Sequence, residues 1–167
     1  MLTITFAGDP LELKDEQIKV GDTLPNVRLF DNNLTAFDTA KTNGLRVFLT
    51  VPSLDTPVCD LEVRTFNEKA SELPGVKIYA VSVDLPFAQA RWCGAAHVEA
   101  VQTISDYNGA EFGRATGTFI ADLALLTRSV MIVDADDKVV YLEYVSEITN
   151  PPDYQAAYDC LAELSKG

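Results

Sequence analysis

The chain has 167 residues, a length that suits one domain with a sizeable core, and we predict a single domain over residues 1–167. Asp and Glu number 25 against 13 Lys and Arg, and the resulting net charge of −12 argues against nucleic acid or an anionic membrane as a partner. The sequence has no apolar run of about 18 residues and no basic, apolar leader, so we expect a cytoplasmic protein. Its three cysteines, an odd number, do not make a secreted disulfide framework.

The first half of the chain predicts a β-hairpin followed by a strand, a helix and a strand. Alternating apolar residues around a Gly-Asp-Pro turn predict the hairpin over residues 1–14. Two short strands follow at 27–30 and 34–37, and then comes a buried strand at 45–51 that Pro52 ends. Apolar residues at helical spacing predict a helix that begins near residues 58–60, and residues 76–83 form the next strand. Such a strand, helix and strand make a right-handed βαβ unit.

The second half of the chain predicts alternating helices and strands. Its expected elements are a helix from Pro86 that Gly94 stops, a strand at 101–104, a short helix at 109–115 capped by Asn108, an antiparallel hairpin at 129–133 and 139–145, and a last helix with the apolar stripe Tyr154, Ala157, Tyr158, Leu161 and Leu164. Residues 116–127 receive no assignment. The whole order indicates an α/β chain with a thioredoxin-like fold, in which helices flank both faces of a central mixed sheet.

Cys59 is the strongest candidate for chemistry, because it falls in the first turn of a helix that follows a buried strand. The free N–H groups and the helix dipole there favour a thiolate. Asp60 and Glu62 oppose it, so the thiolate needs a cation, and Arg64 and Arg128 are the candidates. The alternative stays open at this point: Cys59 is a buried, inert cysteine, and Thr56 merely caps the helix.

Counting residues excludes three other cysteine sites. Four residues separate Cys59 from Arg64, one fewer than a phosphatase loop needs, and no two cysteines have the spacing of a thioredoxin-type motif. The single histidine, His97, is expected to be a solvated side chain rather than a protease base. Cys93 and His97 have metal-ligand spacing but lack a third ligand, so we expect no metal and no cofactor. Cys160 lies among apolar residues of the last helix and is expected in the core.

One motif resembles a known family. The pattern Pro52-x-x-x-Thr56-x-x-Cys59 is similar to the active-site motif of the peroxiredoxins. Further segments narrow the resemblance to the thiol peroxidase branch, known as atypical 2-Cys peroxiredoxins, and extend it over nearly the whole chain: SLDTPVC, SVDLPFAQARWCGAA, ISDYNGAEF, RSVMIVD and EITNPPDYQAA.

The resemblance implies a peroxidase that reduces hydrogen peroxide and alkyl hydroperoxides. Cys59 would be the peroxidatic cysteine and would become a sulfenic acid, and Cys93 would be the resolving cysteine of the same chain. Thr56 and Arg128 would hold and polarise the peroxide, while Pro52 would shield the pocket from water. Since a disulfide needs Cα atoms within about 7 Å, we expect local unwinding at both cysteines.

The resemblance also implies partners. Reduced thioredoxin would return the disulfide to two thiols, and the chain would form a homodimer. Two readings compete with the enzyme: a redox-sensing or holdase-like binding protein that uses the same cysteine pair, and a structural module with inert cysteines.

Overall fold

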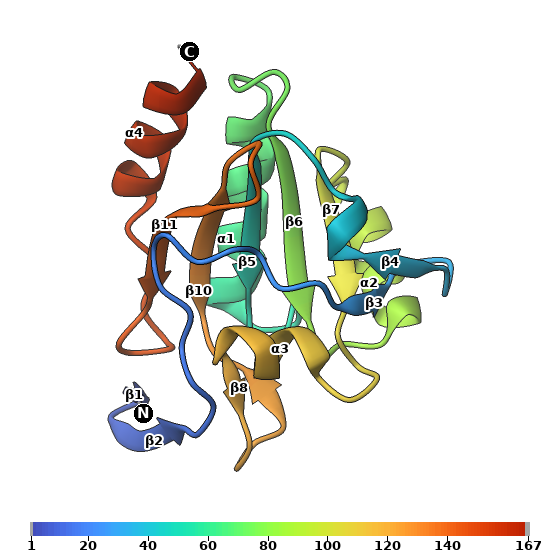
Figure 1. Cartoon of the computed structure of the whole chain (residues 1–167). Coiled ribbons are helices and arrows are strands. Elements are labelled where there is room, and N and C mark those ends of the chain that lie inside the picture. The colour runs from blue at the N-terminus through green and yellow to red at the C-terminus, as the bar shows by residue number, and fades with distance from the viewer. Residues whose placement is uncertain (1, 166–167) are drawn as a thin grey trace.

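The computed structural model describes residues 2–165 and is organised around a seven-stranded mixed sheet (Figure 1). Its spatial order is β11 (Val139–Tyr144), β10 (Ser129–Val133), β5 (Arg46–Thr50), β6 (Lys77–Ser82), β7 (Val101–Ser105), β3 (Arg28–Phe30) and β4 (Ala36–Asp38). The three central strands β5, β6 and β7 run parallel, and the remaining neighbours pair antiparallel. The predicted mixed sheet is therefore confirmed, and the parallel centre places the ends of β5 and β6 at the same edge.

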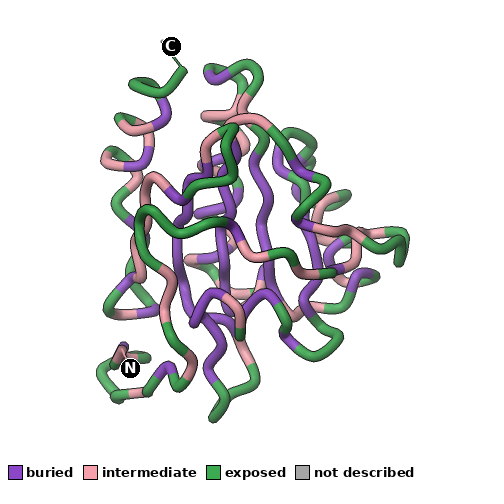
Figure 2. The backbone as a smooth tube through the Cα atoms, viewed as in Figure 1, coloured by how far each residue is buried: buried purple, intermediate pink, exposed green. Residues whose placement is uncertain are grey.

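Helices cover both faces of this sheet, as predicted. The helices α1 (Pro57–Ala70), α2 (Pro86–Ala96) and α4 (Tyr154–Ser165) contribute buried residues to one core cluster, and α3 (Glu111–Thr116) contributes to the other. The side chains of β5 divide between the two clusters: Val47 and Leu49 face the first, whereas Phe48 stacks on Tyr79 and packs against Phe112 in the second. Figure 2 shows the result, with the central strands buried along their length. Burial on both faces explains why the three middle residues of this strand are all apolar.

The predicted N-terminal hairpin exists as a separate two-stranded sheet of β1 (Leu2–Phe6) and β2 (Asp9–Leu13). Ile4 and Leu13 pack in a third small cluster with Ile120 and Ile148. The unassigned stretch 116–127 contains a second small hairpin of β8 (Phe119–Ile120) and β9 (Leu125–Leu126), and a 3₁₀ turn, η1, spans Thr39–Lys41. Residue 1 of the expected hairpin, and residues 166 and 167 of the expected single domain, lie outside the described part. Within residues 2–165, no helix combines the length and apolar character needed to cross a membrane.

Two expected helix boundaries were wrong. Gly94 does not stop α2, which continues to Ala96; the stop is His97, which adopts a left-handed conformation with φ 56° and donates its N–H to the carbonyl of Cys93. Asn108 does not cap α3. The carboxylate of Asp106 does so instead, accepting from the N–H groups at the start of that helix at 3.0 and 2.8 Å. Burial raises the pKa of Asp106 to about 6, although those two hydrogen bonds oppose the shift.

The apolar stripe of α4 is shorter than expected. Ala157 and Leu161 are buried, but Leu164 is 38% exposed, because the helix extends past the sheet it covers. Cys160 is half-buried beside the core rather than within it, which corrects its expected place.

Gly117 allows a close approach between two segments far apart in sequence, and this gives a prediction about stability. Its φ is +72°, and an added Cβ would lie 2.5 Å from the carbonyl oxygen of Glu16. Gly117→Ala should therefore cost about 2–4 kcal/mol of unfolding free energy, from left-handed strain and backbone overlap together. Gly44→Ala is the matched control, since Gly44 has a φ of +74° with open space around it, and it should cost only about 1 kcal/mol. Urea unfolding measures both; equal losses would contradict the account.

Candidate active site

Cys59 is the third residue of α1 and is completely buried. Its helix begins with Pro57, directly after Thr56, so the cysteine lies in the first turn as the sequence predicted. The side chain of Thr56 makes no cap; its hydroxyl donates to the carbonyl of Ser53 at 3.0 Å. Because that donation uses the hydroxyl proton, the oxygen keeps lone pairs with which it can accept a further hydrogen bond.

Asp84, two residues after the end of β6, accepts hydrogen bonds from the loop that leads into Cys59. The hydroxyl of Ser53 donates to one carboxylate oxygen of Asp84 at 2.7 Å, and the N–H of Leu54 donates to the other at 2.8 Å. Pro52 is buried where β5 ends, at the start of this loop. The carboxyl ends of two adjacent parallel strands thus meet at this site, as such sheets favour.

Arg128 supplies the cation beside Cys59. It is 2% exposed and directly precedes β10, its Nη1 donates to Glu62 Oε1 at 3.0 Å, and its Nε donates to the carbonyl of Ile148 at 2.9 Å. Burial alone would lower the pKa of Arg128, but the charges of Glu62 and Cys59, and hydrogen bonds to both, raise it above its usual value. Arg128 therefore stays charged, and its charge is directed at two groups that can be anions.

Glu62 shares this buried site. Burial raises its pKa to about 7, against the opposing effect of the Arg128 charge and hydrogen bond. Its second oxygen, Oε2, is buried and has no hydrogen-bond partner within residues 2–165. Near neutral pH the carboxyl of Glu62 thus holds a proton part of the time, and the charge of Arg128 then lacks this anionic partner.

The second acidic neighbour of Cys59 has a separate partner. Asp60 Oδ2 accepts from Arg64 Nε at 2.9 Å on the exposed side of α1. Both cations proposed from the sequence are thus engaged at the start of α1, Arg64 with Asp60 and Arg128 with Glu62 and Cys59.

Cys93 lies on α2, and its side chain faces β7. Its Sγ is 3.2 Å from Thr103 Oγ1 on β7 and 4.0 Å from Asn32 Nδ2. All three cysteines are free thiols, so the structure does not join Cys59 to Cys93. His97 is exposed at the end of α2, and residues 2–165 contain no cluster of three His, Cys, Asp or Glu side chains that could hold a metal ion.

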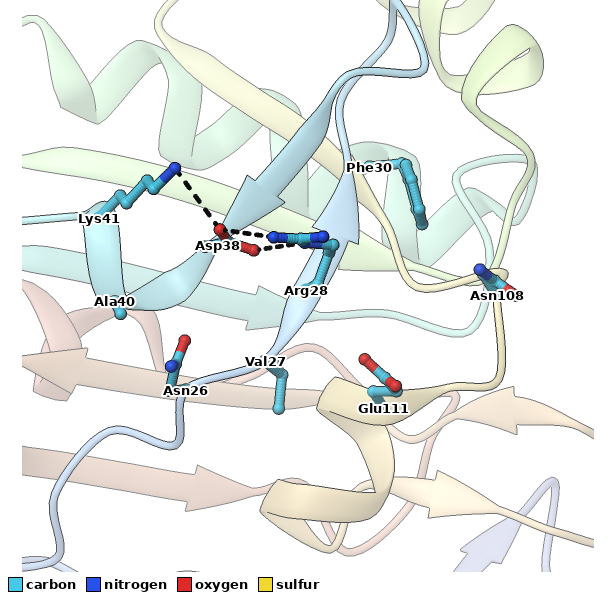
Figure 3. Close-up of a pocket in the computed structure, with 9 residues that line it drawn as sticks. All are labelled: Asn26, Val27, Arg28, Phe30, Asp38, Ala40, Lys41, Asn108 and Glu111. Atoms are coloured by element: carbon cyan, nitrogen blue, oxygen red, sulfur yellow. Dashed lines mark hydrogen bonds and ion pairs between the residues drawn. The ribbon is translucent and has the colours of Figure 1, made fainter.

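The cavity drawn in Figure 3 lies elsewhere, beside β3 and β4. Its volume is about 720 Å³, and none of the predicted site residues lines it. Arg28 and Lys41, which line it, both point toward Asp38 and pair with it, at 2.8 and 3.7 Å. A smaller cavity of about 310 Å³ adjoins the site itself and is lined by Thr56, Pro57 and residues of α1 and α2.

Comparison with known proteins identifies the family. The sequence matches the Redoxin family over residues 19–158. The chain belongs to the Redoxin family. A thiol peroxidase of Clostridium acetobutylicum is 50% identical over 92% of this chain and 93% of its own, and the thiol peroxidase of Bacillus subtilis is 45% identical over 99% and 100%. A peroxiredoxin-like protein from Aquifex aeolicus superposes with a TM-score of 0.92 at 36% identity, covering 97% of this chain and 96% of its own.

The Redoxin match and the relatives make this chain a thiol-dependent peroxidase of the peroxiredoxin type, with a hydroperoxide as its substrate. The resemblance, the thioredoxin-like fold and the enzyme are thereby confirmed, and the reading as a structural module with inert cysteines is set aside.

One residue of the candidate site was misjudged from the sequence. Glu62 was counted only as a charge that opposes the thiolate, whereas it is the buried partner of Arg128. The signal was present, because Cys59, Glu62, Val63 and Phe66 occupy one buried helix face at spacings of three and four. A carboxylate on such a face needs a buried cation.

The raised pKa of Glu62 gives a pH prediction. Between the unfolded value of 4.5 and the folded value of about 7, the folded state keeps a proton that the unfolded state releases, so stability falls as pH rises through this window. Glu62→Gln removes this contribution. The difference in unfolding free energy between the variant and the natural chain should therefore change between pH 5 and pH 7, in favour of the variant at pH 7. Urea unfolding at both values tests this, and a difference independent of pH would contradict it.

Proposed function

We propose that the enzyme works through a two-cysteine cycle in which Cys59 attacks the hydroperoxide and Cys93 resolves the product. The observation that carries the proposal is the burial of the Arg128 cation beside Cys59 at the start of α1. A cation and a helix N-terminus at one sulfur both favour the thiolate, which is the reactive form.

In the first step the Cys59 thiolate attacks the terminal oxygen of the hydroperoxide, and the O–O bond breaks. Cys59 becomes a sulfenic acid, and the leaving oxygen takes up a proton to give water or an alcohol. Arg128 stabilises the charge that develops on the leaving oxygen. The Thr56 oxygen, whose proton is already donated to Ser53, accepts a hydrogen bond from the hydroperoxide. Pro52, buried at the start of the loop, keeps water from the sulfur.

In the second step the Cys93 sulfur attacks the sulfenic sulfur, a disulfide forms, and water leaves. This step requires motion, because Cys93 faces Thr103 while Cys59 is buried against the sheet. Reduced thioredoxin then exchanges with the disulfide and restores both thiols. This cycle requires a compartment that keeps thioredoxin reduced, which fits the expected cytoplasmic location. We also propose that the enzyme forms the expected homodimer.

A coupled assay with thioredoxin, thioredoxin reductase and NADPH tests the cycle. Cys59→Ser should abolish NADPH consumption with every hydroperoxide. Cys93→Ser should reduce one equivalent of hydroperoxide and then stop, because its sulfenic acid has no internal partner. Cys160→Ser is the matched control and should keep its activity. Sustained thioredoxin-dependent turnover by Cys93→Ser would overturn the resolving role.

A further inference from the structure

The residues adjacent to the two reactive cysteines contact each other. Asp60 follows Cys59 on α1, and Trp92, the single tryptophan of the chain, precedes Cys93 on α2. The indole Nε1 of Trp92 donates to Asp60 Oδ1 at 2.8 Å. A hydrogen bond to a charged acceptor thus joins the first turn of one helix to the last turns of the other.

Arg64 strengthens this contact from α1. Besides its ion pair with Asp60, its guanidinium lies 5.7 Å from the centre of the Trp92 ring, in reach of a cation–π interaction. Its Nη1 also donates to the carbonyl of Ala96, the last residue of α2, at 3.3 Å. We name Asp60, Arg64 and Trp92 the helix latch. It joins the start of α1 to the end of α2 while Cys59 and Cys93 are free thiols.

With the helix latch closed, Cys59 and Cys93 are both free thiols, and the Cys93 sulfur faces Thr103. A disulfide requires Cα atoms within about 7 Å and Cβ atoms directed at each other. The end of α2 is intrinsically weak, since Gly94 is an unfavourable helix residue and the turn closes on the left-handed His97. Moving Cys93 out of its helix also moves Trp92, its direct neighbour. The contacts of the helix latch therefore have to break before the sulfurs can meet.

We propose that the helix latch sets the rate at which the Cys59–Cys93 disulfide forms, with Trp92 and Asp60 as positioning residues; this rests on the two-cysteine cycle proposed above. Two reactions compete for the Cys59 sulfenic acid. Cys93 converts it to a disulfide with loss of water, and a second hydroperoxide oxidises it to a sulfinic acid with release of water or an alcohol. A closed helix latch delays the first reaction, so it raises the share of sulfinic acid when hydroperoxide is abundant.

Trp92→Phe tests the proposal, since it keeps an aromatic ring for packing and removes the N–H donor. Arg91→Ala is the matched control on the exposed side of the same helix. Each reduced protein is mixed with an alkyl hydroperoxide in a quenched-flow instrument. Mass spectrometry then measures sulfenic acid, disulfide and sulfinic acid at Cys59 over time.

For Trp92→Phe we expect disulfide formation to be about five- to tenfold faster, as loss of one hydrogen bond allows. The ratio of disulfide to sulfinic acid should rise by the same factor, whereas the rate of sulfenic acid formation and the Arg91→Ala values should stay unchanged. Asp60→Ala, which removes the acceptor instead of the donor, should also accelerate disulfide formation. A merely structural role would lower stability without changing this ratio.

Three outcomes separate the possibilities. Faster disulfide formation in both variants supports the helix latch. An unchanged rate in folded Trp92→Phe and Asp60→Ala, with a normal disulfide in the natural chain, overturns the helix latch and leaves the cycle intact. Absence of a Cys59–Cys93 disulfide in the natural chain overturns the cycle, and the helix latch with it.

Discussion

The burial of Arg128 between Glu62 and Cys59 is the interaction on which the site depends. A guanidinium that is 2% exposed cannot remain there without anionic partners. One partner, Glu62, has its pKa raised to about 7 by the same burial. Glu62 and Cys59 thus both lie beside the single positive charge of Arg128. In the proposed cycle, a thiolate at Cys59 balances the charge of Arg128 when the carboxyl of Glu62 takes up a proton.

In the first turn and a half of α1, the buried side and the exposed side have different interaction partners. Its buried side presents Cys59 and Glu62 to Arg128, and its exposed side presents Asp60 to Arg64 and Trp92. Two acidic residues beside a thiol disfavour its ionisation when they are unpaired. Here each of the two acidic residues has its own cationic partner. The same division leaves the exposed side free to connect α1 with the helix that carries Cys93.

Much of this could be predicted from the sequence, because the central strands and α1 carry strong periodic patterns. The place of Cys59 in the first turn, and Asp84 at the neighbouring strand end, follow from the βαβ order alone. The end of α2 could not be predicted, since Gly94 is tolerated inside a helix while His97 takes the left-handed position. The partner of Glu62 could not be predicted with certainty either, because it comes from a strand end 66 residues away.

The most direct test asks which sulfur reacts first and whether Arg128 governs it. The reduced protein, carrying Cys93→Ser so that the product persists, is treated with one equivalent of hydroperoxide and a dimedone-type trap for sulfenic acid. The same experiment is repeated with Arg128→Gln in a Glu62→Gln background, where no buried carboxylate loses its cation. The account predicts rapid labelling of Cys59 alone, and labelling at least tenfold slower without Arg128 than in the Glu62→Gln background. Labelling at Cys160, or a rate that does not depend on Arg128, would contradict it.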